Sequence, residues 1–206
     1  MSVSRRAFLV AAAAGAVAGC SGSGHGRVLA TTTTSTTLPV GAAQPSGDLA
    51  FAARAAAVEN TLAGAYGSLV ALDRLGAVPV GLKGLWETFE SHHRDHATAW
   101  NAVLTAAGDN VVPTTDDALS GAVVTPGIAA VKDIDGAIAF AAGLERAAAA
   151  TYLLVIEGVL TTPGALQTAA AIQPMELQHV AILAMLSGSD PVPGSFATTA
   201  GALSLT

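Results

Sequence analysis

The sequence predicts an all-α protein, a four-helix bundle of two antiparallel hairpins joined by one long crossover. Three observations predict it. Apolar residues recur every three or four positions between about residues 48 and 188, which is the period of an amphipathic helix. Turn-forming residues divide this region into four segments, with short, long and short connections in that order. A pattern of Glu and His residues also occurs twice, once in each predicted hairpin.

The first two helices are bounded by clear helix breakers. An apolar stripe starts near Asp48, and Gly76 together with Pro79 is expected to end that helix. The second helix is predicted from about Val80 to Ala107, with Gly108 as its stop. The short connection makes the two helices an antiparallel hairpin.

The third and fourth helices form the second hairpin. Asp133 or Asp135 is a suitable N-cap for the third helix, which is expected to end near Gly158. Thr162 followed by proline reads as the N-cap and first residue of the fourth helix, which ends near Leu186. Pro174 falls inside this fourth helix and is expected to kink or restart it, because proline removes a backbone hydrogen bond.

The connection between the hairpins, residues 108–132, shows no helical period. A helix of about 25 residues is roughly 37 Å long, and an extended chain covers about 3.3 Å per residue. The connection can therefore travel the length of the bundle. One long crossover between two hairpins differs from a simple up-down-up-down bundle.

The duplicated pattern consists of a lone Glu followed 31 residues later by Glu-x-x-His. Each lone Glu also has a Tyr seven residues after it. The first copy comprises Glu59, Tyr66, Glu90 and His93, and the second comprises Glu145, Tyr152, Glu176 and His179.

Carboxylates on apolar helix faces need a partner, because a buried charge without one costs several kcal/mol or takes up a proton. Glu59 and Glu145 lie on such faces. Two divalent ions would offset four carboxylates, with two neutral imidazoles as further ligands. Carboxylate and imidazole ligands suit iron and manganese. The alternative is four solvated Glu and two surface His, which is the usual place of these residue types.

The six-residue pattern resembles the ligand set of the ferritin-like superfamily, and the segment from Glu176 to Leu186 is similar to the last helix of that group. The resemblance covers about residues 48–188. It implies two iron ions, alternatively manganese, with Glu90 and Glu176 as bridging carboxylates. It further implies that Tyr66 and Tyr152 hydrogen-bond ligating carboxylates, an outer layer that orients the ligands; ordinary aromatic core is the alternative. The metal ligands that the resemblance implies are Glu59, Glu90, His93, Glu145, Glu176 and His179.

Two other histidines are near the pattern. His96 lies one turn beyond His93, but the equivalent position in the second copy is Ile182, so His96 is interpreted as accessory or exposed. His92 is about 100° around the helix from His93 and is expected to face outward.

The N-terminus predicts export. Arg5 and Arg6 precede an apolar run too short to span a bilayer, which is typical of a twin-arginine signal. Cys20, the only cysteine, follows that run as in a bacterial lipobox, where the cysteine is lipidated. We expect a protein tethered by lipid to the outer face of the cytoplasmic membrane. The expected parts are a signal peptide (1–19), a lipidated Cys20 with a Ser/Thr/Gly-rich linker (20–47), the helical domain (48–188) and a C-terminal tail (189–206).

The net charge and the Glu/His pattern limit the classes of function that the sequence supports. A net charge of −6 and a pI near 5.2, without a basic patch, argue against nucleic-acid binding. The leading hypothesis is a dinuclear redox site that reacts with a small oxidant, dioxygen or peroxide. A non-catalytic metal-binding or structural module of the cell envelope is the alternative, and a bundle that has lost its metal is a third reading.

Overall fold

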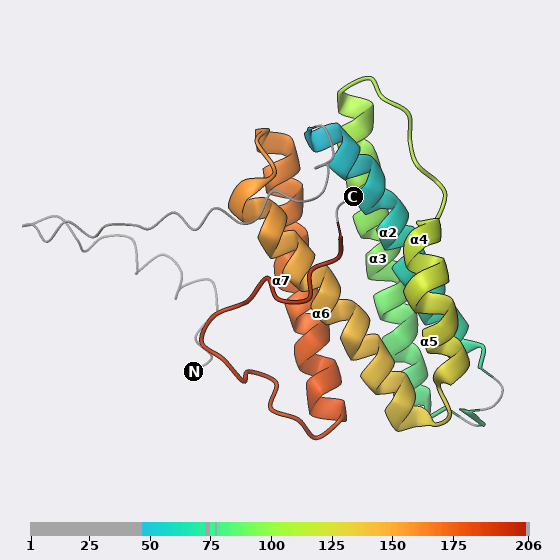
Figure 1. Cartoon of the computed structure of the whole chain (residues 1–206). Helices are drawn as coiled ribbons and strands as arrows, with labels where there is room; N and C mark the ends of the chain where they lie inside the picture. The colour runs from blue at the N-terminus through green and yellow to red at the C-terminus, as the bar shows by residue number, and fades with distance from the viewer. Residues whose placement is uncertain (1–46, 73–74, 77, 205–206) are drawn as a thin grey trace, which may run out of the picture. The chain divides into compact units, whose positions relative to one another are not determined.

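The computed structural model describes residues 47–72, 75–76 and 78–204, and these residues form helices without any strand. Four long helices make the bundle: α2 (Asp48–Val70), α3 (Val80–Ala106), α6 (Ile134–Gly158) and α7 (Pro163–Leu186). Helix α2 packs chiefly on α3, and α6 packs chiefly on α7, while α3 also contacts α7 (Figure 1). The predicted all-α bundle of two hairpins is confirmed.

The ends of the long helices follow the expected signals with one exception. Asp133 caps α6, because its side chain accepts a hydrogen bond of 2.8 Å from the Gly136 amide. Gly108 has a φ of +80° immediately after α3, a conformation that glycine adopts without strain. Helix α2, however, ends at Val70 rather than near Gly76. The apolar period continues past Val70 because Leu72 and Leu75 pack on the core from the connection itself.

Helix α7 runs without interruption from Pro163 to Leu186, with Pro174 inside it. The expected restart of the helix at Pro174 is therefore not observed. The residues around Pro174 are held by packing, since Ile172 and Glu176 are both buried in the bundle. Tertiary packing of this kind routinely overrides local helix propensity.

The crossover differs from the sequence-based expectation. It contains the short helix α4 (Asp117–Leu119), a π-helical turn η2 (Ser120–Val124) and the helix α5 (Thr125–Ala130). Asp116 begins this run by accepting a hydrogen bond of 2.8 Å from the Leu119 amide, and it forms an ion pair of 3.3 Å with Arg54 on α2. Helices this short cannot display an apolar period, which is why the sequence did not reveal them.

The crossover and the tail both pack against the bundle (Figure 1). A Cβ atom built on Gly127 of α5 would lie 2.2 Å from the ring of Phe140, so this close contact with α6 requires glycine. The C-terminal tail returns to α6, where the Leu203 amide donates a hydrogen bond of 2.8 Å to the Thr151 hydroxyl.

Two apolar clusters occupy opposite ends of the bundle. One is built around Phe51, Trp100 and Ile172, and the other around Trp86, Phe89 and Leu183. Between them lies a layer of buried polar side chains. The fold thus holds its polar residues where apolar packing closes the bundle on both sides.

Helices α6 and α7 are long and apolar enough to cross a membrane by length and composition alone. Core helices of bundles pass the same test. In this fold both helices turn charged residues inward, with Glu145 on α6 and Glu176 and His179 on α7 buried in the bundle.

Candidate metal centre

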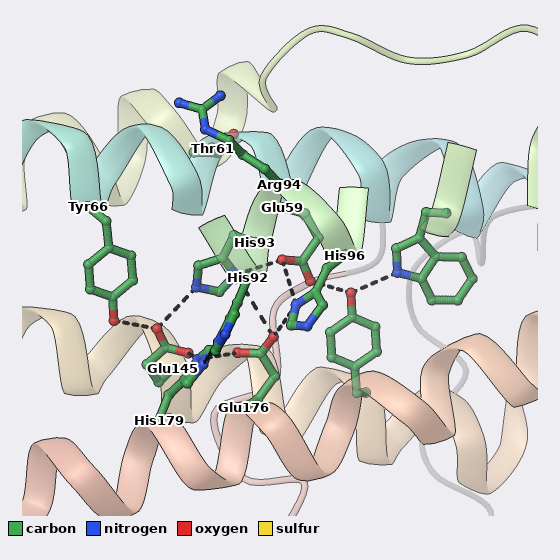
Figure 2. Close-up of polar contacts among 12 residues, drawn as sticks. Glu59, Thr61, Tyr66, His92, His93, Arg94, His96, Glu145, Glu176 and His179 are labelled. Carbon is green, nitrogen blue, oxygen red and sulfur yellow. Dashed lines mark hydrogen bonds and ion pairs between the residues drawn. The ribbon is translucent and has the colours of Figure 1, made fainter. Parts of the chain in front are cut away.

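The polar layer contains six buried Glu and His side chains from all four long helices (Figure 2). Five of them are at most 1% exposed and the sixth, His96, is 9% exposed. Helix α2 supplies one residue, α3 two, α6 one and α7 two. The six are Glu59, His93, His96, Glu145, Glu176 and His179.

His93 lies at the centre of this layer. Its Nδ1 is 2.7 Å from Oε2 of Glu59, and its Nε2 is 3.1 Å from Oε1 of Glu145. One imidazole on α3 therefore faces the carboxylates of both α2 and α6. His179 similarly places its Nδ1 3.1 Å from Oε2 of Glu145.

Two tyrosines cross between the hairpins to hold the lone carboxylates. The Tyr66 hydroxyl on α2 donates to Glu145 on α6, and the Tyr152 hydroxyl on α6 donates to Glu59 on α2. Tyr152 in turn accepts a hydrogen bond of 2.8 Å from Nε1 of Trp100. Each hairpin thus positions the carboxylate of the other through the kind of contact that the resemblance implied for Tyr66 and Tyr152.

The electrostatics of the layer follow from these contacts. Burial favours a raised pKa for Glu59, but His93 and His96 outweigh it through hydrogen bonds and charge and lower its pKa to about 2. Burial favours a lowered pKa for His96, yet Glu176 and Glu59 raise it to about 9. Burial, reinforced by the charge of Glu145, raises the pKa of Tyr66 well above its usual value, so its hydroxyl remains a donor.

Three buried polar atoms in the layer make no hydrogen bond: Nδ1 of His96 and both carboxylate oxygens of Glu176. Nδ1 of His96 lies 2.9 Å from Oε1 of Glu176, a close approach without hydrogen-bond geometry. Buried polar atoms are nearly always partnered. Donor atoms that converge in this way fit coordination of a cation.

The donor atoms form two groups that each fit one ion. Within each group, one atom from every residue lies within 4.8 Å of the others. The first group is Glu59, His93, His96 and Glu176, and the second is His93, Glu145, Glu176 and His179. Carboxylate and imidazole donors of this kind suit iron, manganese or zinc.

Five of the six predicted ligands meet in this layer, but Glu90 does not. Its side chain is 24% exposed, and it forms an ion pair of 2.5 Å with Arg94 on the outer part of α3. A Cβ atom on Gly67 would lie 3.5 Å from its Oε2, so Glu90 lies over the α2–α3 contact. The buried face of α3 is centred on Phe89, His93 and Trp100, which leaves Glu90 at its edge.

The interpretation of the two other histidines requires correction. His96 is buried inside the layer, 2.9 Å from Glu176, rather than accessory or exposed. His92 is half-buried, with its Nδ1 2.9 Å from Nε2 of His179, rather than facing outward. The signal that identifies His96 is its place in the buried stripe of α3, three positions from His93 and four from Trp100. The predicted roles of Arg5, Arg6 and Cys20 lie outside the described residues.

The family of the chain follows from a comparison with protein-family models. No curated protein and no solved structure shows significant similarity to the chain. A family model described as ferritin-like domain matches residues 47–189, which include all four long helices and the whole polar layer. The chain belongs to the ferritin-like domain family.

Proposed function

We propose that this protein is an exported, membrane-tethered ferritin-like protein. Its bundle binds two metal ions, with iron as the leading candidate, and uses them to reduce dioxygen or peroxide. The observation that carries the proposal is the buried layer of three carboxylates and three imidazoles, whose nitrogen and oxygen atoms converge in two groups and three of which make no hydrogen bond. Manganese is the alternative metal, since the same donor types suit both ions.

The carboxylates and imidazoles of the layer have different roles in metal binding. Glu59, Glu145 and Glu176 supply negative charge, while the imidazoles of His93, His96 and His179 ligate in the neutral form. A pair of redox-active ions, when bound, would supply the electrons that reduce the oxidant. Because ligation uses imidazole nitrogens that otherwise carry protons, metal binding releases protons.

The surroundings favour a small oxidant. The apolar clusters at either end of the layer exclude bulk water. A cavity of about 20 Å³, large enough for about one water molecule, lies beside Glu59 and Tyr152. Its lining is mainly apolar and includes Phe51, Val58 and Leu203. Such a space suits dioxygen or hydrogen peroxide better than an organic substrate.

The test combines metal content with turnover. We expect about two iron ions per chain in protein produced with iron, and peroxide consumption by the loaded protein. Glu145→Ala with Glu176→Ala should abolish both. Glu157→Ala is the matched control, because Glu157 lies exposed on the same helix as Glu145. Metal binding without turnover would reduce the function to a metal-binding module, and a folded protein that binds no metal would overturn the proposal.

Export and tethering have their own test. Replacing Arg5 and Arg6 by Lys should retain the protein in the cytoplasm, since the twin-arginine route depends on that pair. Cys20→Ser should move the exported protein from the membrane fraction to the soluble fraction, because the lipid is lost. Persistence of the Cys20→Ser variant in the membrane would contradict lipidation at Cys20.

A further inference from the structure

The two hairpins share one pattern of burial when α3 and α7 are aligned by their buried residues. Six of the eight buried residues of α3 follow steps of 4, 3, 4, 3 and 4, and the six buried residues of α7 follow the same steps; Ala97 and Leu104 are the further buried residues of α3. In order, Leu82, Trp86, Phe89, His93, His96 and Trp100 correspond to Ala165, Ala169, Ile172, Glu176, His179 and Leu183. In this alignment His93 is equivalent to Glu176, and His96 is equivalent to His179.

The 31-residue repeat pairs Glu90 with Glu176, whereas this alignment pairs His93 with Glu176. The two alignments of α3 therefore differ by three residues, which is close to one helical turn. The connection between α2 and α3 (71–79) is longer than that between α6 and α7 (159–162). Helix α2 also ends sooner after Glu59 than α6 ends after Glu145. These differences shift α3 relative to the sequence repeat, so that Glu90 and Glu176 are not structural equivalents.

The two donor groups obey the same symmetry. Glu59 and His96 belong to the first group alone, while Glu145 and His179 belong to the second alone. His93 and Glu176 belong to both groups, and they are equivalent to each other in the alignment of α3 with α7. Glu90 belongs to neither group.

We infer that α3 binds metal through His93 and His96, and that Glu90 is not a ligand. This inference rests on the proposed metal centre and specifies its ligands. Nδ1 of His96 makes no hydrogen bond but lies in the buried layer, 2.9 Å from Oε1 of Glu176, whereas the Glu90 carboxylate lies outside the layer and pairs with Arg94. The centre then has three carboxylates and three imidazoles, which with two divalent ions leaves one net positive charge instead of none.

Cobalt(II) titration of the metal-free full chain tests the inference, because bound cobalt has visible absorption bands that report its ligands. We expect two cobalt ions per chain in the unaltered protein. His96→Ala should bind one ion, or two with the second at least tenfold weaker, and its absorption bands should change. Glu90→Ala should bind two ions with dissociation constants within twofold and unchanged bands.

The opposite result, with the second ion lost in Glu90→Ala and kept in His96→Ala, would overturn the assignment. His96→Gln serves as a second variant of similar size, and far-UV circular dichroism confirms that each variant is helical. If the unaltered protein binds no cobalt, iron or manganese, the metal centre itself fails, and the assignment fails with it. That outcome is distinct from the first, in which the unaltered protein binds two ions.

Discussion

The first hairpin fills the core with aromatic side chains on α3, whereas the second hairpin places small or aliphatic side chains at the equivalent positions of α7. Trp86 corresponds to Ala169, and Trp100 corresponds to Leu183. Trp100 lies in the same cluster as Ala169, and Trp86 lies in the same cluster as Leu183, so each Trp is packed with a smaller side chain of α7. The comparison shows that a repeated framework can keep its pattern of burial while the two halves differ in volume and in ligand type.

The largest loss of stability is expected from truncating an aromatic side chain of α3. Trp86 is fully buried, so Trp86→Ala should cost about 3–5 kcal/mol of unfolding free energy. At the equivalent position Ala169→Gly should cost about 1 kcal/mol, mainly through helix propensity. Urea unfolding followed by circular dichroism measures both. Equal costs would contradict the assignment of core volume to α3.

The hydrogen bonds of Tyr66 and Tyr152 occupy equivalent positions, but their loss should lower the unfolding free energy by different amounts. Tyr66→Phe removes one hydrogen bond to a buried carboxylate and should cost about 2 kcal/mol. Tyr152→Phe should cost about 1 kcal/mol more, because the indole N–H of Trp100 also loses its acceptor. Unfolding in the presence of a chelator isolates these costs from metal binding. A larger cost for Tyr66→Phe would show that the Trp100 contact contributes little.

Asp48 distinguishes the hairpins by charge, since the equivalent residue of α6 is Ile134. Burial favours a raised pKa for Asp48, but hydrogen bonds from Thr162 and Thr161 outweigh it and lower the pKa below 3.8. A carboxyl group with a lowered folded pKa stabilises the fold fully above its unfolded pKa, and that stabilisation is lost as pH falls through the folded value.

Asp48→Asn should therefore cost about 1–2 kcal/mol at pH 7 and less at pH 3. Urea unfolding at the two pH values measures the difference. Asp135→Asn is the control, because Asp135 is exposed in the first turn of α6. A cost for Asp48→Asn that does not change with pH would argue against a charged contact with Thr161 and Thr162.

The smallest effect concerns helix propensity. Gly143 on α6 corresponds to Ala57 on α2, and a Cβ atom at Gly143 would meet no neighbour within 4 Å. Gly143→Ala should raise the unfolding free energy by about 1 kcal/mol, and Ala57→Gly should lower it by a similar amount. Thermal unfolding of the two variants checks the pair. A destabilised Gly143→Ala variant would reveal a contact at that surface.

Much of the fold was predictable because helical period and helix breakers are local properties of the chain. The bounds of α6 and α7 follow from Asp133, Thr162 and the residues after Leu186. The short helices of the crossover were missed because three to six residues carry no period. The early end of α2 was missed because Leu72 and Leu75 keep the apolar pattern while packing from a loop.

Sequence by itself determined the class of fold, the two hairpins and the carboxylates of Glu59, Glu145 and Glu176 as a group. The repeat indicated Glu90 as a ligand and left His96 as accessory or exposed, whereas the structure places His96 among the clustered donors and Glu90 outside them. In an α-helix the residues three before and three after His93 lie about 60° to either side of it, so both positions fit the same pattern. Only the tertiary structure decided which side faces the core, because the packing of Phe89 and Trp100 fixes the rotation of α3.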